Sequence, residues 1–100
     1  MNELVIRTSK VPGKNNKHKV LMYAISTCVW CKRAKRFLTN HSVEFEYVDV
    51  DLCSIDELRE IKDDILKRGG RLIYPTIIID DRILMTNPSE KKLQEALESK

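Results

Sequence analysis

Two cysteines stand three residues apart in the segment Cys28-Val29-Trp30-Cys31, and the chain holds one other, Cys53. This spacing suits three uses: a dithiol that cycles with a disulfide, part of a metal site, or two small apolar side chains at a helix start. A thiol becomes a nucleophile when it loses its proton, and the unpaired N–H groups of a helix N-terminus favour the thiolate. The choice therefore depends on where the pair lies relative to a helix.

The residues around the pair place it between a strand and a helix. Residues 20–25 form a continuous apolar run, typical of a strand buried on both faces. Residues 31–41 repeat apolar side chains at helical spacing, with basic side chains on the other faces. Cys28 then precedes the first helical turn and is the expected nucleophile. Cys31 lies one turn further in, so we expect it to be more buried and to resolve mixed disulfides.

A zinc site is the main alternative for the pair. Structural zinc sites need four ligands, and the remaining candidates are Cys53, His18 and His41, which form no second close pair. The strand-to-helix position also argues against two inert thiols. The sequence favours a redox-active pair without metal, and Cys53 is interpreted as a buried or incidental thiol rather than a regulatory one.

Further elements alternate along the chain with short connections. Residues 43–47 alternate like a half-buried strand, and the apolar positions then change phase. Ser54 and Glu57 form a capping-box pattern, and the apolar helical stripe that follows ends at Gly69-Gly70. A second helix is therefore predicted after residue 54.

The last third of the chain predicts a hairpin and a helix. Residues 76–79 and 82–85 are apolar strands around Asp80-Asp81, because aspartate tolerates the left-handed conformations of a tight turn. Asn87 is then predicted to cap the last helix, with Pro88 at its first position.

This order of elements predicts an α/β fold with a mixed four-stranded sheet and three flanking helices. A right-handed βαβ unit makes the first two strands parallel, and the antiparallel hairpin completes the sheet. Residues 4–8 are a candidate edge strand in an N-terminal extension, 1–18, ahead of a redox domain, 19–100. The basic cluster between them is interpreted as a solvated loop. It contains Lys10, Lys14, Lys17, His18 and Lys19.

Composition restricts the class of protein. The 100 residues are 42% hydrophobic and 33% charged, which indicates one soluble globular domain. A net charge of +3 gives no reason to expect nucleic acid or a membrane as partner. No secretory signal pattern follows Met1, so we expect a cytoplasmic protein. A close cysteine pair in that reducing compartment is more often catalytic or metal-binding than a permanent disulfide.

The segment from Met22 to Leu38 resembles the active-site region of glutaredoxins, in which a strand ends in Cys-x-aromatic-Cys and enters a basic helix. The resemblance continues through residues 45–51 and 74–80. It implies the thioredoxin fold and thiol–disulfide exchange. It also implies a cis bond before Pro75, with the backbone of the preceding residue offered to the substrate.

The turn after the hairpin departs from the family pattern. Many glutaredoxins hold the glutamyl end of glutathione with a Gly-Gly-x-Asp-like turn, whereas residues 86–90 read Thr-Asn-Pro-Ser-Glu. The reductant is therefore glutathione or, in a redoxin resembling the electron donors of ribonucleotide reductase, a flavin- or ferredoxin-linked reductase. A third alternative is an iron–sulfur or metal carrier, because some glutaredoxins bridge a cluster between two protomers. We expect a monomer with no tightly bound cofactor, acting on protein disulfides.

Two residues inside the motif also differ from the common glutaredoxin pattern, since Val29 replaces proline and Trp30 replaces tyrosine. Trp30 either presents its indole for docking of a protein substrate or packs across the helix start. Lys32 adds cationic charge close to the pair. The predicted substrate-binding residues are Thr27, Trp30, Lys32, Tyr74, Pro75, Asn87 and Ser89.

Overall fold

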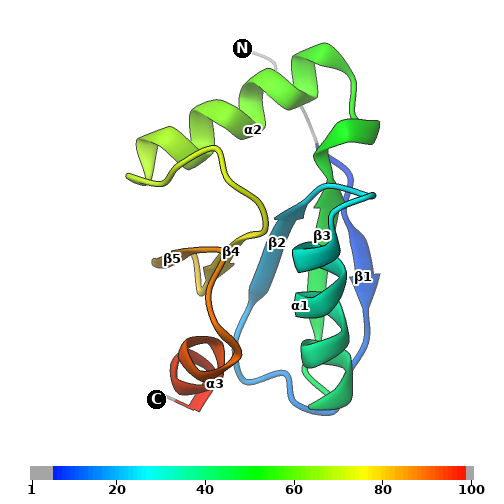
Figure 1. Ribbon diagram of the computed structural model, residues 1–100, viewed down its shortest axis with the longest axis vertical. Coiled ribbons are helices and arrows are strands. Elements are labelled where there is room, and N and C mark those ends of the chain that lie inside the picture. Colours follow the sequence, from blue (N-terminus) through cyan, green and yellow to red (C-terminus); the bar gives the residue numbers. More distant parts are fainter. Residues whose placement is uncertain (1–5, 99–100) are drawn as a thin grey trace.

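The computed structural model describes residues 6–98, which form a five-stranded mixed sheet with three helices (Figure 1). The strands are β1 (Ser9–Val11), β2 (Val20–Ala24), β3 (Phe45–Asp49), β4 (Thr76–Ile79) and β5 (Ile83–Thr86). The helices are α1 (Val29–Asn40), α2 (Ile55–Lys67) and α3 (Glu90–Glu98), with a short 3-10 helix η1 (Val50–Leu52). Within the order β1-β3-β2-β4-β5, β2 and β3 are parallel and the other neighbours are antiparallel. The predicted α/β fold is confirmed.

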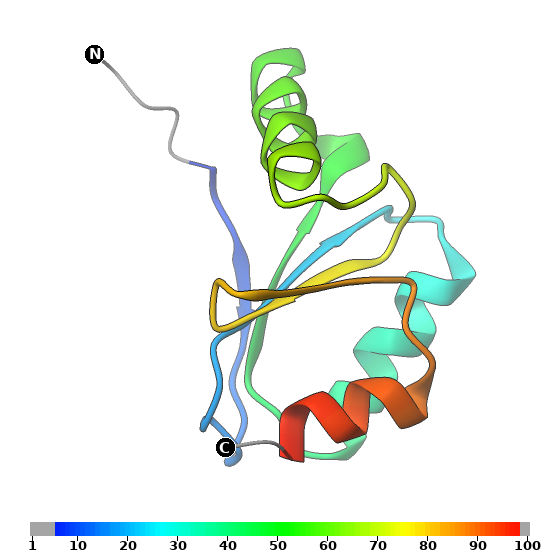
Figure 2. The same cartoon turned by 90° about the vertical axis from the view of Figure 1, so that its left-hand side faces the viewer.

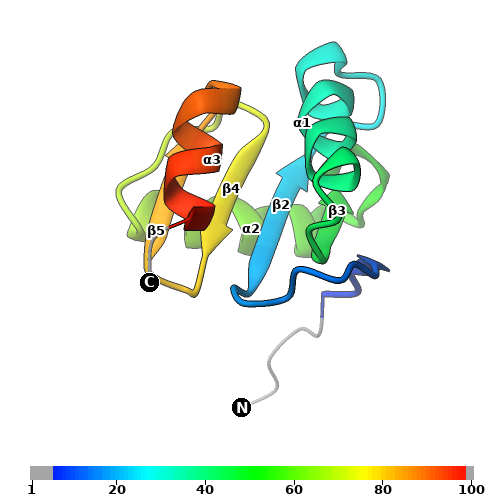
Figure 3. The ribbon, with the colours of Figure 1, turned by 90° about the horizontal axis from the view of Figure 1, so that it is seen from below.

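The sheet separates two hydrophobic clusters. Helices α1 and α3 cover one face and α2 covers the other (Figures 2 and 3). Side chains of β2 alternate between the clusters, because successive residues of a strand point to opposite faces: Met22 packs under α1 and α3, and Tyr23 packs under α2. A strand covered on both faces explains the continuous apolar run.

The change of phase around β3 now has a physical reason. Phe45 and Tyr47 pack toward α1 and α3, whereas Val48 and Val50 belong to the cluster under α2. The chain therefore alternates without interruption, and the burial moves from one face of the sheet to the other. The strand predicted at residues 43–47 begins and ends two residues before β3.

The N-terminal edge strand exists, although not where it was predicted. Among residues 6–8 the chain forms no strand, and residues 4 and 5 lie outside the described residues. Pairing with β3 begins at Ser9, opposite Tyr47, so part of the predicted solvated loop belongs to the sheet. His18 lies in a loop, as predicted, but it is not solvated: its side chain is only 9% exposed, and its Nδ1 lies 2.6 Å from a carboxylate oxygen of Asp80.

The helix boundaries follow from their caps. Ser54 and Glu57 form both hydrogen bonds of the predicted capping box at the start of α2. The predicted cap at Asn87 is wrong: this residue has φ 43°, and the hydroxyl of Ser89 instead accepts a hydrogen bond from the backbone N–H of Lys92. Helix α3 accordingly begins two residues after the predicted first position.

The hairpin turn has the backbone that its residues suggested. Asp80 and Asp81 both have positive φ, 55° and 56°, as a tight two-residue turn demands. None of the helices in the described part of the chain is long and apolar enough to cross a membrane.

Candidate active site

Cys28 is the N-cap residue of α1. Its backbone N–H donates to the carbonyl of Ile25 at 3.0 Å, and its thiol sulfur accepts from the backbone N–H of Cys31 at 3.2 Å. The end of β2 and the first turn of α1 therefore hold the sulfur where a capping oxygen normally lies. This position matches the predicted nucleophile.

The surroundings of Cys28 lower the pKa of its thiol. Burial raises this pKa, but the hydrogen bonds from the Cys31 thiol and from the backbone N–H groups of Cys31 and Trp30 outweigh burial, and the charge of Lys35 adds to them. The hydrogen bonds and the positive charge all favour the thiolate. Cys28 is also partly exposed, so its sulfur is accessible to a substrate.

Cys31 has the opposite environment. Its side chain is fully buried, and its sulfur accepts a hydrogen bond from the backbone N–H of Ile25 at 3.4 Å. Burial, the hydrogen bond to Cys28 and the charge on Cys28 together raise the pKa of Cys31 to about 12. The two cysteines of the motif therefore differ as an exposed nucleophile and a sheltered thiol should.

Lys35 is a functional candidate that sequence reasoning missed. Its ammonium lies 3.2 Å from a carboxylate oxygen of Asp49 and 4.0 Å from the centre of the Tyr47 ring. These contacts from β3 keep the charge partly buried, where solvent screens it less. Lys35 lies seven residues after Cys28, two helical turns along the same face, and that spacing was the available signal. The predicted cation, Lys32, is exposed.

The loop before β4 lies against the nucleophile. The bond between Tyr74 and Pro75 is cis, as the resemblance implied, and the carbonyl oxygen of Tyr74 lies 4.0 Å from the Cys28 sulfur. Ser26, two residues before Cys28, is held by Asp51: the Ser26 backbone N–H donates to the carboxylate at 2.8 Å, and the hydroxyl donates as well. The roles of Tyr74, Pro75 and the exposed Thr27 toward a substrate stay predictions.

The turn after β5 is already occupied by internal hydrogen bonds. The backbone N–H of Asn87 donates to the carbonyl of Pro75 at 2.7 Å, and Ser89 caps α3. Asn87 therefore lies beside the cis-proline loop. The N–H of Asn87 is thus not available to a glutamyl carboxylate, whereas the Ser89 hydroxyl accepts its hydrogen bond and keeps its own proton to donate.

A groove of about 420 Å³ opens beside the pair, between α1 and the start of α3. Trp30 lines it and is 53% exposed, with the guanidinium of Arg33 5.3 Å from the centre of the indole ring. Two alternatives were predicted for Trp30, an indole presented to a protein substrate and an indole packed across the helix start. The structure has an exposed indole, and docking of a substrate on it stays a prediction.

Cys53 stands apart from this arrangement. It is half-buried, its sulfur lies 3.7 Å from the carbonyl oxygen of Asp49, and burial together with the nearby carboxylates of Glu57, Asp51 and Asp49 raises the pKa of its thiol. Within residues 6–98, no group of three or more histidine, cysteine or acidic side chains is arranged to hold a metal ion.

Comparison with known proteins agrees with this geometry. A family model described as glutaredoxin matches residues 20–84. The crystal structure of a glutaredoxin from Methanosarcina mazei Go1 is 36% identical, with a TM-score of 0.83 over 94% of this chain and 90% of that one. Methanoredoxin of Methanosarcina acetivorans is 38% identical, with a TM-score of 0.75 over 81% of this chain and 85% of that one. An uncharacterised monothiol glutaredoxin of Caenorhabditis elegans is 27% identical over 78% of this chain, which spans 53% of its length.

Proposed function

The protein belongs to the glutaredoxin family, and on that premise we propose that it reduces protein or glutathione mixed disulfides through a dithiol of Cys28 and Cys31. The observation that carries the proposal is the opposite direction of the two pKa shifts. A low pKa on the accessible sulfur and a high pKa on the buried one assign a different step to each.

In the first step the thiolate of Cys28 attacks one sulfur of the substrate disulfide. A new S–S bond forms between Cys28 and that sulfur, the substrate bond breaks, and the second substrate sulfur leaves as a thiolate. In the second step Cys31 loses its proton and attacks the Cys28 sulfur, which closes the Cys28–Cys31 disulfide and releases the other half of the substrate as a thiolate. Two electrons pass from the protein to the substrate.

The first step also prepares Cys31 for the second. Two of the influences that raise the pKa of Cys31 are the charge on Cys28 and the hydrogen bond between the two side chains, and both weaken once Cys28 forms a mixed disulfide. The hydrogen bond from the N–H of Ile25 and the charge of Lys35, which favour the Cys31 thiolate, remain. The Cys31 thiol is therefore unreactive until Cys28 has formed the mixed disulfide.

The test uses single-cysteine variants of the full chain. Cys28→Ser should abolish reduction of a protein disulfide such as that of insulin. Cys31→Ser should accumulate a mixed disulfide on Cys28, visible by mass spectrometry, and Cys53→Ser is the matched control that keeps the wild-type rate. Wild-type turnover by Cys28→Ser would rule the mechanism out.

For the electron source we propose two candidates, glutathione and a flavin- or ferredoxin-linked reductase. The turn at residues 86–90 supports the second, because the N–H of Asn87 is bonded internally to the carbonyl of Pro75. A panel that couples the oxidised protein to glutathione with glutathione reductase, or to NADPH with thioredoxin reductase, separates them. Rapid turnover with glutathione alone would remove the case for the alternative.

The remaining parts of the proposal concern the setting of the protein. We propose a cytoplasmic monomer without a tightly bound cofactor, which meets disulfide substrates and its reductase through the edge of the sheet that carries Cys28. An iron–sulfur carrier is the competing function, and anaerobic reconstitution tests it: a coloured, cluster-bridged dimer would favour that function over disulfide reduction.

A further inference from the structure

The groove between α1 and α3 has an apolar floor and a charged rim. Phe37 and Leu93 form its base and are 7% and 1% exposed, and Trp30 forms one wall. Across the opening, the guanidinium of Arg33 on α1 faces the carboxylate of Glu90 on α3 at 3.8 Å. The groove is therefore built to receive an apolar side chain, with one cation and one anion at its entrance.

The ion pair at the entrance is weak. The two side chains are 62% and 58% exposed, and exposed pairs of this kind contribute only about 0–1 kcal/mol. Arg33 also lies over the exposed ring of Trp30, so it keeps a favourable contact when its carboxylate partner is exchanged. A carboxylate from another molecule can replace Glu90 at little cost.

The volume suits a short peptide segment. At about 420 Å³ the groove falls within the range of roughly 300–1,000 Å³ typical of small-ligand sites. Two lining residues connect it to the reaction centre: Trp30 follows Cys28 by two residues in the first turn of α1, and the backbone N–H of Asn87 donates to the carbonyl of Pro75, next to the Tyr74 carbonyl that lies 4.0 Å from the Cys28 sulfur. The groove therefore lies next to the reaction centre, where residues that flank a substrate disulfide can reach it.

We propose that this groove selects protein substrates in which an apolar residue and an acidic residue lie next to the disulfide. The proposal rests on the function proposed above and names its substrate class. The apolar side chain packs against Phe37 and Leu93, and the acidic side chain takes the place of Glu90 on Arg33. A basic side chain that pairs with Glu90 has to lie next to the guanidinium of Arg33, which stays over the Trp30 ring, and so meets like charge at the entrance.

The experiment compares two synthetic peptides, each with one intramolecular disulfide flanked by two leucines and by either two glutamates or two lysines. Pre-reduced protein is mixed with each peptide in a single turnover, and the second-order rate constant is read by acid quenching and mass spectrometry. The ratio of the two constants is the readout, because a change in the reactivity of Cys28 affects both peptides alike.

For the wild-type chain we expect the acidic peptide to react roughly 3–10 times faster at low salt, since charges at the rim of an interface act mainly on association. Arg33→Glu should reverse the ratio, and Glu90→Gln should raise it by removing the internal competitor. Arg36→Gln changes an exposed arginine of α1 that does not line the groove and should keep the wild-type ratio.

A ratio near one in the wild-type chain, or one that Arg33→Glu does not move, would overturn the proposed selection. A third peptide with serines in place of the leucines tests the apolar part, and an equal rate for it would overturn that part. Failure of the proposed function is distinguishable, because no peptide disulfide would then be reduced at all.

Discussion

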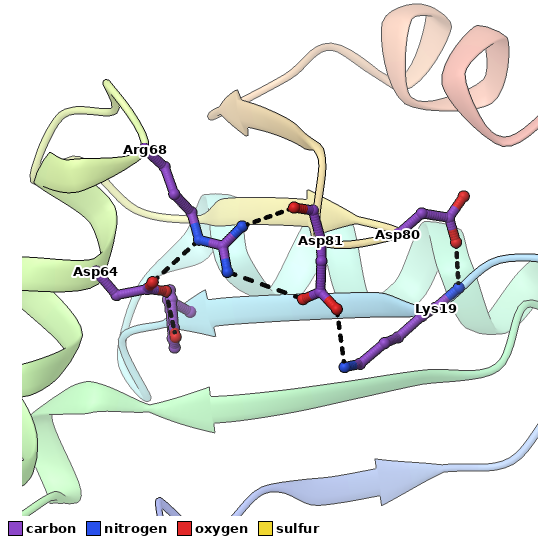
Figure 4. Close-up of polar contacts among 6 residues, drawn as sticks. Lys19, Asp64, Arg68, Asp80 and Asp81 are labelled. Atoms are coloured by element: carbon purple, nitrogen blue, oxygen red, sulfur yellow. Dashed lines mark hydrogen bonds and ion pairs between the residues drawn. The ribbon is translucent and has the colours of Figure 1, made fainter. Parts of the chain in front are cut away.

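The sheet carries different chemistry at the two ends of β2. The side where β2 ends, at Cys28, is called the reactive edge, and the side where β2 begins, at Lys19, is called the stable edge. Where β2 ends, the segments next to Cys28 carry exposed apolar side chains: Val29 and Trp30 follow it on α1, and Leu72 and Ile73 precede Tyr74, whose carbonyl oxygen lies 4.0 Å from the Cys28 sulfur. Where β2 begins, charged side chains from three segments are paired. The ammonium of Lys19 and the guanidinium of Arg68 both contact Asp81, and Asp80 accepts from the backbone of Lys19 (Figure 4).

The difference shows how one fold combines a reactive edge with a stable one. Arg68 joins α2 to the hairpin turn, because its guanidinium donates to Asp64 at 3.0 Å and to the carbonyl of Asp81 at 2.9 Å (Figure 4). Tyr23 extends the connection into the sheet, since its hydroxyl donates to Asp64 at 3.0 Å. Opposite charges are paired at the edge that holds the elements together, whereas the opposite edge leaves the Cys28 thiol partly exposed among exposed apolar side chains.

The largest effect expected at the reactive edge is a difference in alkylation between the two motif cysteines. With a pKa of about 12, Cys31 is a thiolate in roughly one molecule in 10⁵ at pH 7, whereas the pKa of Cys28 lies below its ordinary value. Brief exposure of the reduced chain to iodoacetamide should label Cys28 more than about a thousandfold faster, as read by peptide mass spectrometry.

The pH profile sharpens that measurement. Labelling of Cys28 should rise at a lower pH than that of an unperturbed cysteine peptide, because only the thiolate reacts and its proton leaves earlier. Labelling of Cys31 should rise only in strong base. Comparable labelling of both residues at pH 7 would remove the distinction on which the proposed steps depend.

The stable edge should respond to Arg68→Met. This change removes the hydrogen bonds from the guanidinium to Asp64 and to the carbonyl of Asp81, and it should lower the free energy of unfolding by about 1–2 kcal/mol. Urea denaturation measures the loss, and Arg59→Met, an exposed arginine on the same helix, is the control. The iodoacetamide profile of Cys28 should stay that of the wild type; a changed profile would show that the two edges are coupled.

Much of the fold could be predicted because its signals are local. The double-sided burial of β2, the capping box at Ser54 and the tight turn at Asp80-Asp81 each depend on residues close in sequence. The edge strand β1 could not be placed, because its pairing depends on β3, which lies more than thirty residues away along the chain.

The candidate site divides in the same way. The unlike environments of Cys28 and Cys31 could be predicted from their places at the start of a helix. By contrast, the partial burial of Lys35 depends on Asp49 and Tyr47 of β3, and Asn87, the predicted cap, is bonded instead to the carbonyl of Pro75 in the segment before β4. Such long-range contacts leave no local pattern in the sequence.

The smallest effect expected is on the electrostatics of the reactive edge. Lys35→Met removes a partly buried charge that favours the Cys28 thiolate, so the alkylation rate at pH 7 should fall by a factor of about 2–3. The effect is small because the hydrogen bonds from Cys31 and Trp30 remain. Lys32→Met is the informative comparison, since Lys32 is nearer in sequence but exposed; a larger loss from Lys32→Met would show that sequence proximity outweighs burial in setting the reactivity of Cys28.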